Sequence, residues 1–454
     1  MSIIALIDIG KTNSKLSLID SNTGERTFTA ARANRIVRND LGAQLDLFAI
    51  EEWLVRTLAA APDVGVVSAI VPVAHGAAAV LLDKHHDVIA ACDYEDAQFD
   101  SVADAYRERR DGFMKTYSPD LSLGLNLGRQ LFFLQTKHAD VFARVTHALL
   151  YPQYWAWRCC GVIASEVSSL GCHTDLWLPG ECAYSSLAID QNWADLFPPI
   201  QFAGDTLGTV TPAFAAATGL PLSCRVVCGV HDSNASYLKV LLGREDEGFT
   251  IVSSGTWTIA MSNGGELAML QEQRDMLANV DVFGSAVPTA RYMGGREYEL
   301  IAGTREDADL TAIARSIETG AMALPAFVGS GPFASRHGSV IGLQDAGRGG
   351  SAAVATLYSV LMTDALIESL GFQQNVFIDG PFARNPFFNR LLASCDRSRR
   401  VLVSSAAELA GVCFLAGAQV QPCEPSEPAQ PLDISGFDHY RARWRELTAK
   451  EPST

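Results

Sequence analysis

The sequence predicts an α/β protein built from two domains, and three observations predict it. The chain has 454 residues, which is more than a single hydrophobic core usually serves. Its first strand-like segments are followed by a helix and another strand, an order that favours a mixed sheet. A strand–turn–strand layout then begins again near residue 249. We therefore place an N-terminal domain at 1–243 and a C-terminal domain at 244–454.

Three strands are expected at the start of the N-terminal domain. Ile3–Ile9 is apolar over most of its length, Lys15–Ile19 alternates, and Arg26–Ala33 resumes an extended pattern. Apolar residues recur on one face of Phe48–Ala60, which predicts a helix. The β-branched run Val64–Val71 is typical of a strand that is buried on both faces.

The C-terminal domain opens with a similar hairpin, in which Phe249–Ser253 enters a turn and Thr256–Met261 leaves it. Two hairpins that each open a domain-sized stretch suggest an ancient duplication. Alternating helices and strands are expected further on: a helix at Ala352–Leu370 closed by Gly371, a strand at Val376–Asp379, a helix at Asn385–Cys395, a strand at Arg400–Val403 and a helix at Ala406–Gly417.

Composition narrows the class of protein. The net charge is −16 and the pI is near 5.0, so the basic stripe that nucleic-acid binding requires is not expected. The N-terminus reads as a strand rather than a signal peptide, and no uncharged apolar stretch reaches the length of a membrane span. The ten cysteines are scattered without a metal-ligand spacing. We expect a cytoplasmic protein with reduced thiols and no nucleic-acid or membrane partner.

The first glycine turn superficially resembles a P-loop, because Lys11 and Thr12 follow Gly10. A P-loop also requires a glycine five residues before its final glycine, and a helix after it. Here Ala5 occupies the glycine position and a strand follows. The turn is therefore not a P-loop.

A phosphate-cradling hairpin is the better interpretation of the same turn. Gly10 allows a tight turn and a close approach of the backbone to a ligand. Thr12 and Asn13 offer hydrogen-bond donors, Lys15 adds a positive charge, and Asp8 at the end of a buried strand is placed to hold Mg²⁺ through water. An ordinary polar hairpin turn is the alternative.

Three later segments repeat this kind of local chemistry. Ser253–Trp257 places small residues and donors at a second strand–turn–strand. Asp379–Phe382, followed by Asn385, turns from a strand into a helix, which suits a nucleoside. Ala410 and Gly411 indicate close helix packing.

Taken together, these segments resemble the FGGY family of carbohydrate kinases, within the actin-like, ribonuclease-H-like ATPase fold. The resemblance runs from Ile4 to about Ala418 and is closest to the rhamnulokinase and fuculokinase branch. Ala148–Trp155 resembles the family's L-x-x-P-D-Y-L segment, and Gly229–Asp232 resembles its G-x-H-D segment. Ser253–Trp257 is similar to the S-S-G-T-W turn of the rhamnulokinase branch.

The resemblance implies two ribonuclease-H-like domains with a ligand cleft between them, and a reaction that uses ATP and Mg²⁺. Asp232 would be the general base that takes the proton of the sugar hydroxyl, and His231 would contact the sugar. Gly255 and Thr256 would hold the ATP phosphates, and Asp8 would hold the metal. The γ-phosphate side would be contacted by Gly10, Thr12, Asn13 and Lys15. The nucleoside would be contacted by Gly380, Asn385 and Gly411.

The sequence also departs from the family pattern. Pro381 follows Gly380 where many relatives carry further glycines, and it removes a backbone donor on the adenine side. Met293 stands where rhamnulokinase has an asparagine, so the sugar pocket is not expected to be a copy of that enzyme's pocket. Arg296, three residues on, is a candidate sugar-binding residue.

Several alternatives stay open from the sequence alone. Asp232 could serve as a helix N-cap and His231 as a structural histidine. The favoured function is a kinase for a ketose or 6-deoxyketose such as L-rhamnulose or L-fuculose, with a homodimer left open. An actin-like nucleotide-dependent switch or sugar sensor without catalysis is the second hypothesis. An acid-sugar kinase or a phosphatase on the same fold is the third.

Overall fold

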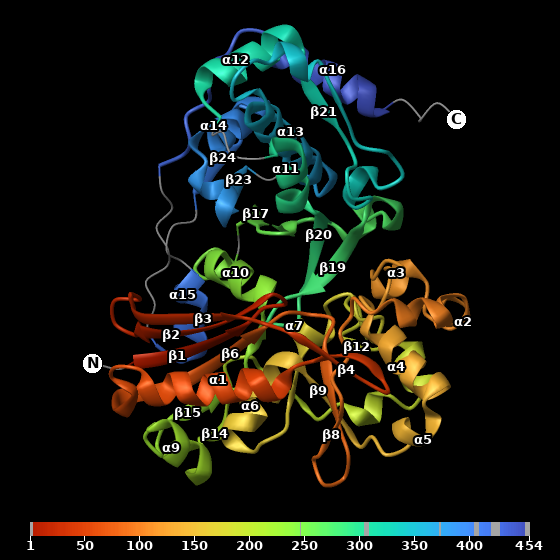
Figure 1. Ribbon diagram of the computed structural model, residues 1–454, viewed down its shortest axis with the longest axis vertical. Coiled ribbons are helices and arrows are strands. Elements are labelled where there is room, and N and C mark those ends of the chain that lie inside the picture. Colours follow the sequence, from red (N-terminus) through yellow and green to blue (C-terminus); the bar gives the residue numbers. More distant parts are fainter. Residues whose placement is uncertain are drawn as a thin grey trace. The chain divides into compact units, whose positions relative to one another are not determined.

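A computed structural model of the chain describes residues 3–245, 247–303, 308–371, 374–403, 408–418 and 427–449. It divides into two compact units, each with its own sheet (Figure 1). Unit 1 is Met1–Gly243 with Ala278–Ala286 and Ala407–Pro422, and unit 2 is Arg244–Leu277, Val287–Ala406 and Cys423–Thr454. The two later segments of unit 1 fall within the range 244–454 that the sequence assigned to the C-terminal domain. They pack with unit 1 because a sheet face can be covered by a distant part of the chain.

The main sheet of unit 1 has the strand order β14-β15-β6-β1-β2-β3, with β16 also paired to β6. Strands β1, β2 and β3 run antiparallel in succession, whereas β1, β6 and β15 are parallel. These strands are β1 (Ile3–Ile9), β2 (Asn13–Asp20), β3 (Arg26–Ala33), β6 (Val67–Ala74), β14 (Thr206–Thr209), β15 (Arg225–Val227) and β16 (Val230–His231). The predicted strand at Val64–Val71 begins three residues later than expected, because Asp63 (φ 57°) starts a 3-10 turn at Val64–Val66.

Both faces of this sheet are covered, which explains why β1 is apolar almost throughout. Ile3, Ile7 and Ile9 pack on the face covered by α1 (Leu47–Ala60), whereas Ile4 and Leu6 pack on the opposite face. Helices α10 (Asp232–Leu241) and α15 (Glu408–Leu415) supply that second face, and Figure 1 shows α1 on the other side of the sheet. The alternation follows the two-residue period of a strand.

Smaller elements complete unit 1. The strands are β4 (Ile36–Asn39), β5 (Gly42–Leu45), β7 (Ala79–Leu82), β8 (Val88–Ala90), β9 (His147–Leu150), β10 (Ser165–Glu166), β11 (Trp177–Leu178), β12 (Ala183–Tyr184) and β13 (Ile200–Gln201). The helices are α2 (Ala103–Arg107), α3 (Phe113–Thr116), α4 (Leu127–Lys137), α5 (Ala139–Phe142), α6 (Tyr151–Cys160), α7 (Val167–Leu170), α8 (Ser186–Asp190) and α9 (Pro212–Thr218).

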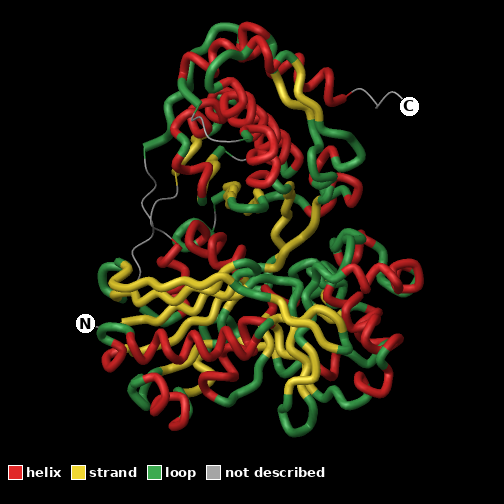
Figure 2. Tube along the Cα trace, viewed as in Figure 1, coloured by secondary structure: helices red, strands yellow, loops and turns green. Residues whose placement is uncertain are grey.

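The sheet of unit 2 repeats the plan of unit 1, and Figure 2 shows each sheet flanked by helices. Its order is β19-β20-β18-β17-β23-β24, with an antiparallel hairpin followed by two strands parallel to the first. The strands are β17 (Phe249–Ser254), β18 (Thr258–Asn263), β19 (Met276–Val280), β20 (Ala286–Tyr292), β23 (Asn375–Asp379) and β24 (Arg400–Val403), with β21 (Met322–Leu324) and β22 (Ser339–Ile341) apart. The shared order and directions fit the duplication that the two hairpins suggested.

Helix α13 (Gly350–Ser369) is the core helix of unit 2, packed by α11 (Gly294–Ala302), α12 (Leu310–Thr319) and α14 (Pro386–Cys395). It is also long and apolar enough to cross a membrane by length and composition alone, although it carries Asp364 and Glu368 and is not an uncharged stretch. Of its apolar window, 89% is buried inside the structure, as in the core helix of a folded domain. Helix α16 (Phe437–Ala449) ends the described chain.

The predicted helix at Ala406–Gly417 corresponds to α15, whose described residues begin at Glu408. Residues 406 and 407 lie outside the described part of the chain. Helix α15 belongs to unit 1, although the strand before it belongs to unit 2. The helix predicted at Asn385–Cys395 is α14, with Asn385 as its N-cap.

Candidate functional site

The carboxyl ends of three parallel strands bring two predicted residues together in unit 1. Asp8 of β1 lies opposite Val73 of β6, and Val230 of β16 lies opposite the same Val73 on the other side. His231 ends β16 and Asp232 begins the following helix. The predicted metal ligand and the predicted general base therefore lie at one edge of one sheet, separated by a single strand. Such edges are where open α/β sheets bind ligands.

The turn between β1 and β2 forms the rim of this edge. The Gly10 amide donates to the Asn13 carbonyl (2.9 Å), so Gly10 shapes the turn with its own backbone. Thr12 and Asn13 are exposed at its tip. The turn is braced by Asn34, whose Nδ2 donates to the Gly10 carbonyl (2.7 Å) and whose Oδ1 accepts from the Ser14 hydroxyl (2.6 Å). No sequence pattern pointed to Asn34, because it reaches the turn from the residue after β3.

The two lysines of this hairpin lie near different carboxylates. Lys15 Nζ lies 3.8 Å from Asp8 Oδ2 with much of its side chain exposed, so its charge stays at the site. Lys11 instead forms ion pairs with Asp93 and, at 3.4 Å, with Glu95. Lys15 is therefore the lysine placed to face a phosphate next to Asp8.

Asp232 occupies the first turn of α10, with His231 in the N-cap position. Its Oδ1 accepts from the backbone N–H of Ser233 (2.6 Å) and from the Ser233 hydroxyl (3.2 Å). Asp232 thus satisfies a donor at the start of the helix, much as a capping residue does. Its side chain remains 41% exposed, so the same carboxylate is also accessible to a ligand.

His231 is 5% exposed, and both of its ring nitrogens face protein groups. Nε2 lies 3.2 Å from Asp232 Oδ1 and 3.4 Å from Cys172 Sγ, and Nδ1 lies 3.3 Å from Asn234 Nδ2. Burial lowers the pKa of His231, but the charges of Cys172, Asp232 and Glu166 together raise that pKa to about 9. The structure therefore places His231 behind Asp232, as a neighbour of the base.

A second histidine at this edge, His75, was missed by sequence reasoning. It follows β6 directly, and its Nδ1 lies 2.8 Å from the Gly76 carbonyl. Burial lowers its pKa, and the charge of Asp232 acts against that shift, which places His75 near the predicted base. A polar residue directly after a buried strand was the available signal, the same signal that identified Asp8.

The corresponding edge of unit 2 is built on the β17–β18 turn. Gly255 and Thr256 are exposed at this turn, and the Gly255 amide donates to the carbonyl of residue 257 (2.8 Å). The Ser254 hydroxyl donates to the Asp379 carbonyl (2.5 Å) at the end of the neighbouring parallel strand. Gly380 follows with φ +78°, and a Cβ there would lie 1.9 Å from the Ser254 carbonyl oxygen. The structure therefore brings Gly255, Thr256 and Gly380 together.

The start of α11 packs directly against this turn. A Cβ on Gly295 would lie 2.1 Å from the Gly255 carbonyl oxygen, and a Cβ on Gly294 would lie 2.1 Å from Thr258 Oγ1. Arg296 comes next, but its side chain is 57% exposed and its nearest ion partner is Glu299, 3.6 Å away. The predicted contact of Arg296 with a sugar stays a prediction.

The two remaining predicted nucleoside contacts have structural roles. Asn385 Oδ1 accepts from the amides of Phe387 (3.0 Å) and Phe388 (3.2 Å), so it caps α14. Gly411 lies in α15 of unit 1, and a Cβ there would lie 3.0 Å from the Ala235 carbonyl oxygen of α10. Gly411 thus allows α15 to pack closely against the helix that begins with Asp232.

The residues at the unit 1 edge fit a magnesium ion that is bound jointly by a protein carboxylate and by substrate phosphates. Within the described ranges, no group of three or more His, Cys, Asp or Glu side chains could hold a metal by itself. Mg²⁺ commonly takes only one or two protein carboxylates and completes its shell with water and substrate phosphates. The partly exposed Asp8 beside the glycine turn meets that requirement.

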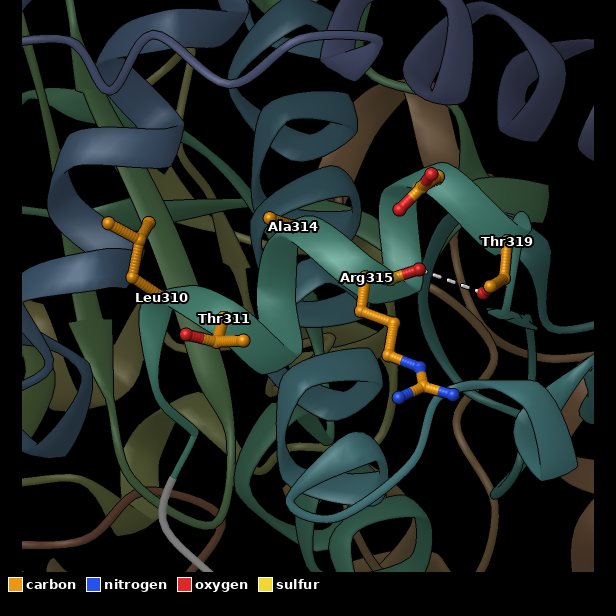
Figure 3. A pocket seen from close by; sticks show the side chains of 6 residues that line it. Leu310, Thr311, Ala314, Arg315 and Thr319 are labelled. Atoms are coloured by element: carbon orange, nitrogen blue, oxygen red, sulfur yellow. Dashed lines mark hydrogen bonds between the residues drawn. The ribbon is translucent and has the colours of Figure 1, made fainter.

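Two surface hollows lie away from all of these residues. One, of about 740 Å³, runs along the outer face of α12, where Arg315 donates from Nε to the Asp345 carbonyl (2.9 Å); Figure 3 shows its lining side chains. The other, of about 410 Å³, lies beside the β4–β5 hairpin of unit 1 and is lined partly by Phe48 and Arg158. Neither contains a predicted site residue.

The family model described as carbohydrate kinase FGGY, C-terminal domain, matches residues 246–425. The structure of a carbohydrate kinase from Novosphingobium aromaticivorans is 35% identical in sequence, with a TM-score of 0.88 and 99% of each chain covered. A search of curated protein sequences found no match.

More distant structures share the fold alone. A ligand-bound xylulose kinase from Lactobacillus acidophilus has 14% identity and a TM-score of 0.79, covering 99% of this chain and 96% of its own. Glycerol kinase from Plasmodium falciparum, solved with ADP, has 12% identity and a TM-score of 0.81, covering 100% and 99%. These matches confirm the predicted α/β fold with two ribonuclease-H-like domains.

Proposed function

Because this chain belongs to the FGGY family of carbohydrate kinases, we propose that it transfers the γ-phosphoryl group of ATP to a hydroxyl of a ketose or 6-deoxyketose such as L-rhamnulose or L-fuculose. One observation carries the assignment of the site. The exposed carboxylate of Asp232 begins α10 at the same sheet edge as Asp8 and the glycine turn. A base and a phosphate-binding turn are the parts that phosphoryl transfer needs close together.

In this mechanism Asp232 accepts the proton of the attacking sugar hydroxyl through its exposed carboxylate oxygen. Its other interactions, with the Ser233 amide and His231, hold the carboxylate in one orientation. Lys15 faces the transferred phosphoryl group and offsets its negative charge. Thr256 at the exposed turn of unit 2 donates to the nucleotide phosphates. Mg²⁺ held by Asp8 would neutralise phosphate charge when bound.

The choice of sugar comes from the sequence motif. Ser253–Trp257 is similar to the turn of the rhamnulokinase branch, and its Gly255 and Thr256 lie exposed at the edge of the unit 2 sheet. The xylulose and glycerol kinases match at 14% and 12% identity, so they support the fold and not a substrate. A kinase distinguishes a sugar from an analogue that lacks one hydroxyl through single hydrogen bonds in its sugar pocket, so a shared fold does not determine the substrate.

We also propose a cytoplasmic location. Nine cysteines of the described chain are free thiols, most of them buried, as is usual in a reducing compartment. The acidic net charge of −16 agrees with a small-molecule substrate in place of a nucleic-acid partner. A homodimer stays a prediction.

The test is ADP release with Mg·ATP against a panel of ketoses, aldoses, 6-deoxysugars, sugar acids and polyols, using wild type and Asp232→Asn. We expect one ketose or 6-deoxyketose to stimulate ADP release, and the variant to lose about 10²- to 10⁴-fold in kcat. Asp140→Asn, an exposed aspartate in α5 of the same unit, is the control and should keep full activity.

Two results would count against the proposal. Full activity in Asp232→Asn would remove Asp232 from the role of base. ATP binding without turnover on any member of the panel would favour the nucleotide-dependent switch or sensor.

A further inference from the structure

Three side chains surround the ring of His231 directly behind the proposed base. Nε2 faces both Asp232 Oδ1 (3.2 Å) and Cys172 Sγ (3.4 Å), and Nδ1 faces the side-chain amide of Asn234 (3.3 Å). Cys172 is 2% exposed and Asn234 is 1% exposed, so water does not compete for these contacts.

We propose that Cys172 is a positioning residue: as a thiolate it keeps His231 in the imidazolium form, whose Nε2–H holds the Asp232 carboxylate in the orientation that catalysis requires. The proposal rests on the proposed function, because it assigns Asp232 the role of base. It adds to that function a residue from the loop after α7 that touches neither substrate nor nucleotide in the mechanism above.

The neighbours of His231 favour a proton on Nε2. A carboxylate oxygen that acts as a base accepts hydrogen bonds, so Nε2 must carry a hydrogen directed toward Asp232. The same nitrogen also faces Cys172 Sγ, so two acidic groups lie against one edge of the ring. A positively charged ring interacts favourably with both of them.

A buried cation needs a buried anion beside it, and Cys172 supplies one. Asp232 is partly exposed, whereas the Cys172 sulfur is enclosed. Burial raises the pKa of the Cys172 thiol, but His173 and His231 outweigh burial and lower it to about 5. The thiolate and the imidazolium therefore stabilise each other at neutral pH.

The other titratable groups around His231 come from several elements. Glu166 on β10 is buried, and burial raises its pKa to about 7, although the amides and hydroxyl of the following serines oppose this. His75 after β6 carries a lowered pKa, and Lys11 in the first turn acts on His75. His173 is next to Cys172 and hydrogen-bonds through Nδ1 to the Leu125 carbonyl (2.8 Å).

The loop that carries Cys172 is held in place by a buried ion pair. Asp175 is fully buried, and its carboxylate accepts from Arg110 at 2.8 and 3.0 Å and from the Tyr106 hydroxyl at 2.7 Å. His173 and Asp175 both adopt positive φ, at 42° and 64°. Such backbone conformations persist only when the surroundings fix them, so the sulfur has a defined position.

The space around the pair is also closed. A Cβ on Gly76 would lie 2.9 Å from His231 Nε2 and 3.1 Å from Cys172 Sγ. A larger residue at this position would require the ring or the sulfur to shift. The loop after β6 therefore belongs to the same arrangement.

The experiment measures the thiolate first, in the ligand-free protein. The ultraviolet thiolate absorbance is titrated with pH in wild type, Cys172→Ser and Cys92→Ser. Cys92 is the control because it is an equally buried cysteine whose pKa burial raises to about 12. We expect wild type and Cys92→Ser to show one thiolate at neutral pH that Cys172→Ser lacks. Its absence from wild type would overturn the proposal.

The second readout is the pH profile of kcat, using whichever sugar supports ADP release. In Cys172→Ser we expect kcat at neutral pH to fall about tenfold, the contribution of one hydrogen bond to a charged group. The loss of activity on the alkaline side should begin about one pH unit lower, because His231 loses its proton more readily. Cys172→Asp, which restores an anion, should recover part of the lost activity.

The outcomes separate the two proposals. An unchanged kcat and pH profile in Cys172→Ser would overturn the positioning role even if the thiolate is present. Failure of wild type to phosphorylate any sugar would refute the proposed function alone, and the thiolate titration would still decide the Cys172–His231 pair. If Cys172→Ser does not fold, Cys172→Ala is measured in its place.

Discussion

Gly380 has both a positive φ and a close contact with a neighbouring strand, and each of these favours glycine. Gly371 of the same unit has a positive φ without such a contact. Gly380 has φ +78°, and a Cβ there would lie 1.9 Å from the Ser254 carbonyl oxygen. Gly371 has φ +87°, but a Cβ there would meet nothing within 4 Å. We expect Gly371→Ala to cost only the backbone strain, about 1 kcal/mol. Gly380→Ala should cost roughly 2 kcal/mol more, because the backbone of β17 must also move.

Chemical denaturation of both variants against wild type measures this difference. Equal losses of stability in the two variants would mean that the contact with Ser254 is not tight. The same comparison bears on function, because a displaced Ser254 would move the exposed turn at Gly255 and Thr256.

At the scale of helices, a buried carboxylate ties the end of the chain to the core of unit 2. Asp364 of α13 is 1% exposed and accepts from Arg399 (2.6 Å), from Arg441 of α16 (2.7 Å) and from Arg445 of α16 (2.9 Å). Glu368, one turn on, contacts Arg441 at 3.0 Å but is 41% exposed. The two carboxylates share partners and differ mainly in burial.

Asp364→Asn should therefore lower the free energy of unfolding by about 3–5 kcal/mol, because it leaves arginines without their buried counter-charge. Glu368→Gln is the matched control and should cost less than about 1 kcal/mol, as expected for an exposed ion pair. Denaturant unfolding of the two variants makes the comparison. A loss in Asp364→Asn no larger than that in Glu368→Gln would show that α16 is held by its apolar side chains alone.

At the scale of the whole chain, unit 1 is completed by a helix that lies more than 150 residues beyond Gly243 in the sequence. Val412 and Leu415 of α15 are buried in the same cluster as Leu238 of α10. A fragment of residues 1–243 should therefore expose one face of α10 and be cut rapidly by proteases. The same fragment joined through a flexible glycine–serine linker to residues 408–418 should be protected.

Limited proteolysis and binding of a hydrophobic dye to the two fragments decide the point. Equal protection of both would mean that unit 1 is stable without α15. Greater protection of the longer fragment would show that α15 stabilises α10, the helix that begins with Asp232. Gly411 permits the close packing of these two helices.

The fold was predictable where local pattern determines structure. Helix α1 begins one residue before its predicted start, and both hairpins lie where the strand patterns placed them. The start of β6 was wrong by three residues, because a left-handed Asp63 leaves no trace in hydropathy. The positions of Asp8 and Asp232 were predictable for the same reason, because each stands at the end of a strand, and their roles stay predictions.

The remainder of the site depends on groups that meet across the chain. Asn34 braces the first turn from the position directly after the third strand, and Cys172 reaches His231 from a loop 59 residues earlier. Asn385 caps a helix, and its predicted contact with a nucleoside stays a prediction. Sequence spacing cannot distinguish these cases, because side-chain direction is set by the packing of neighbouring elements.

The sequence by itself determined the class of fold, the repeated hairpin, the family and the acidic residues at the ends of strands, because these follow from two-residue and 3.6-residue periodicity and from short motifs. Only the tertiary structure decided that α15 belongs to unit 1, that Asn385 caps α14, and that Cys172 contacts His231 behind Asp232. The physical reason is that burial and hydrogen bonding are satisfied by whichever group lies near in space, and the local sequence does not specify which group that is.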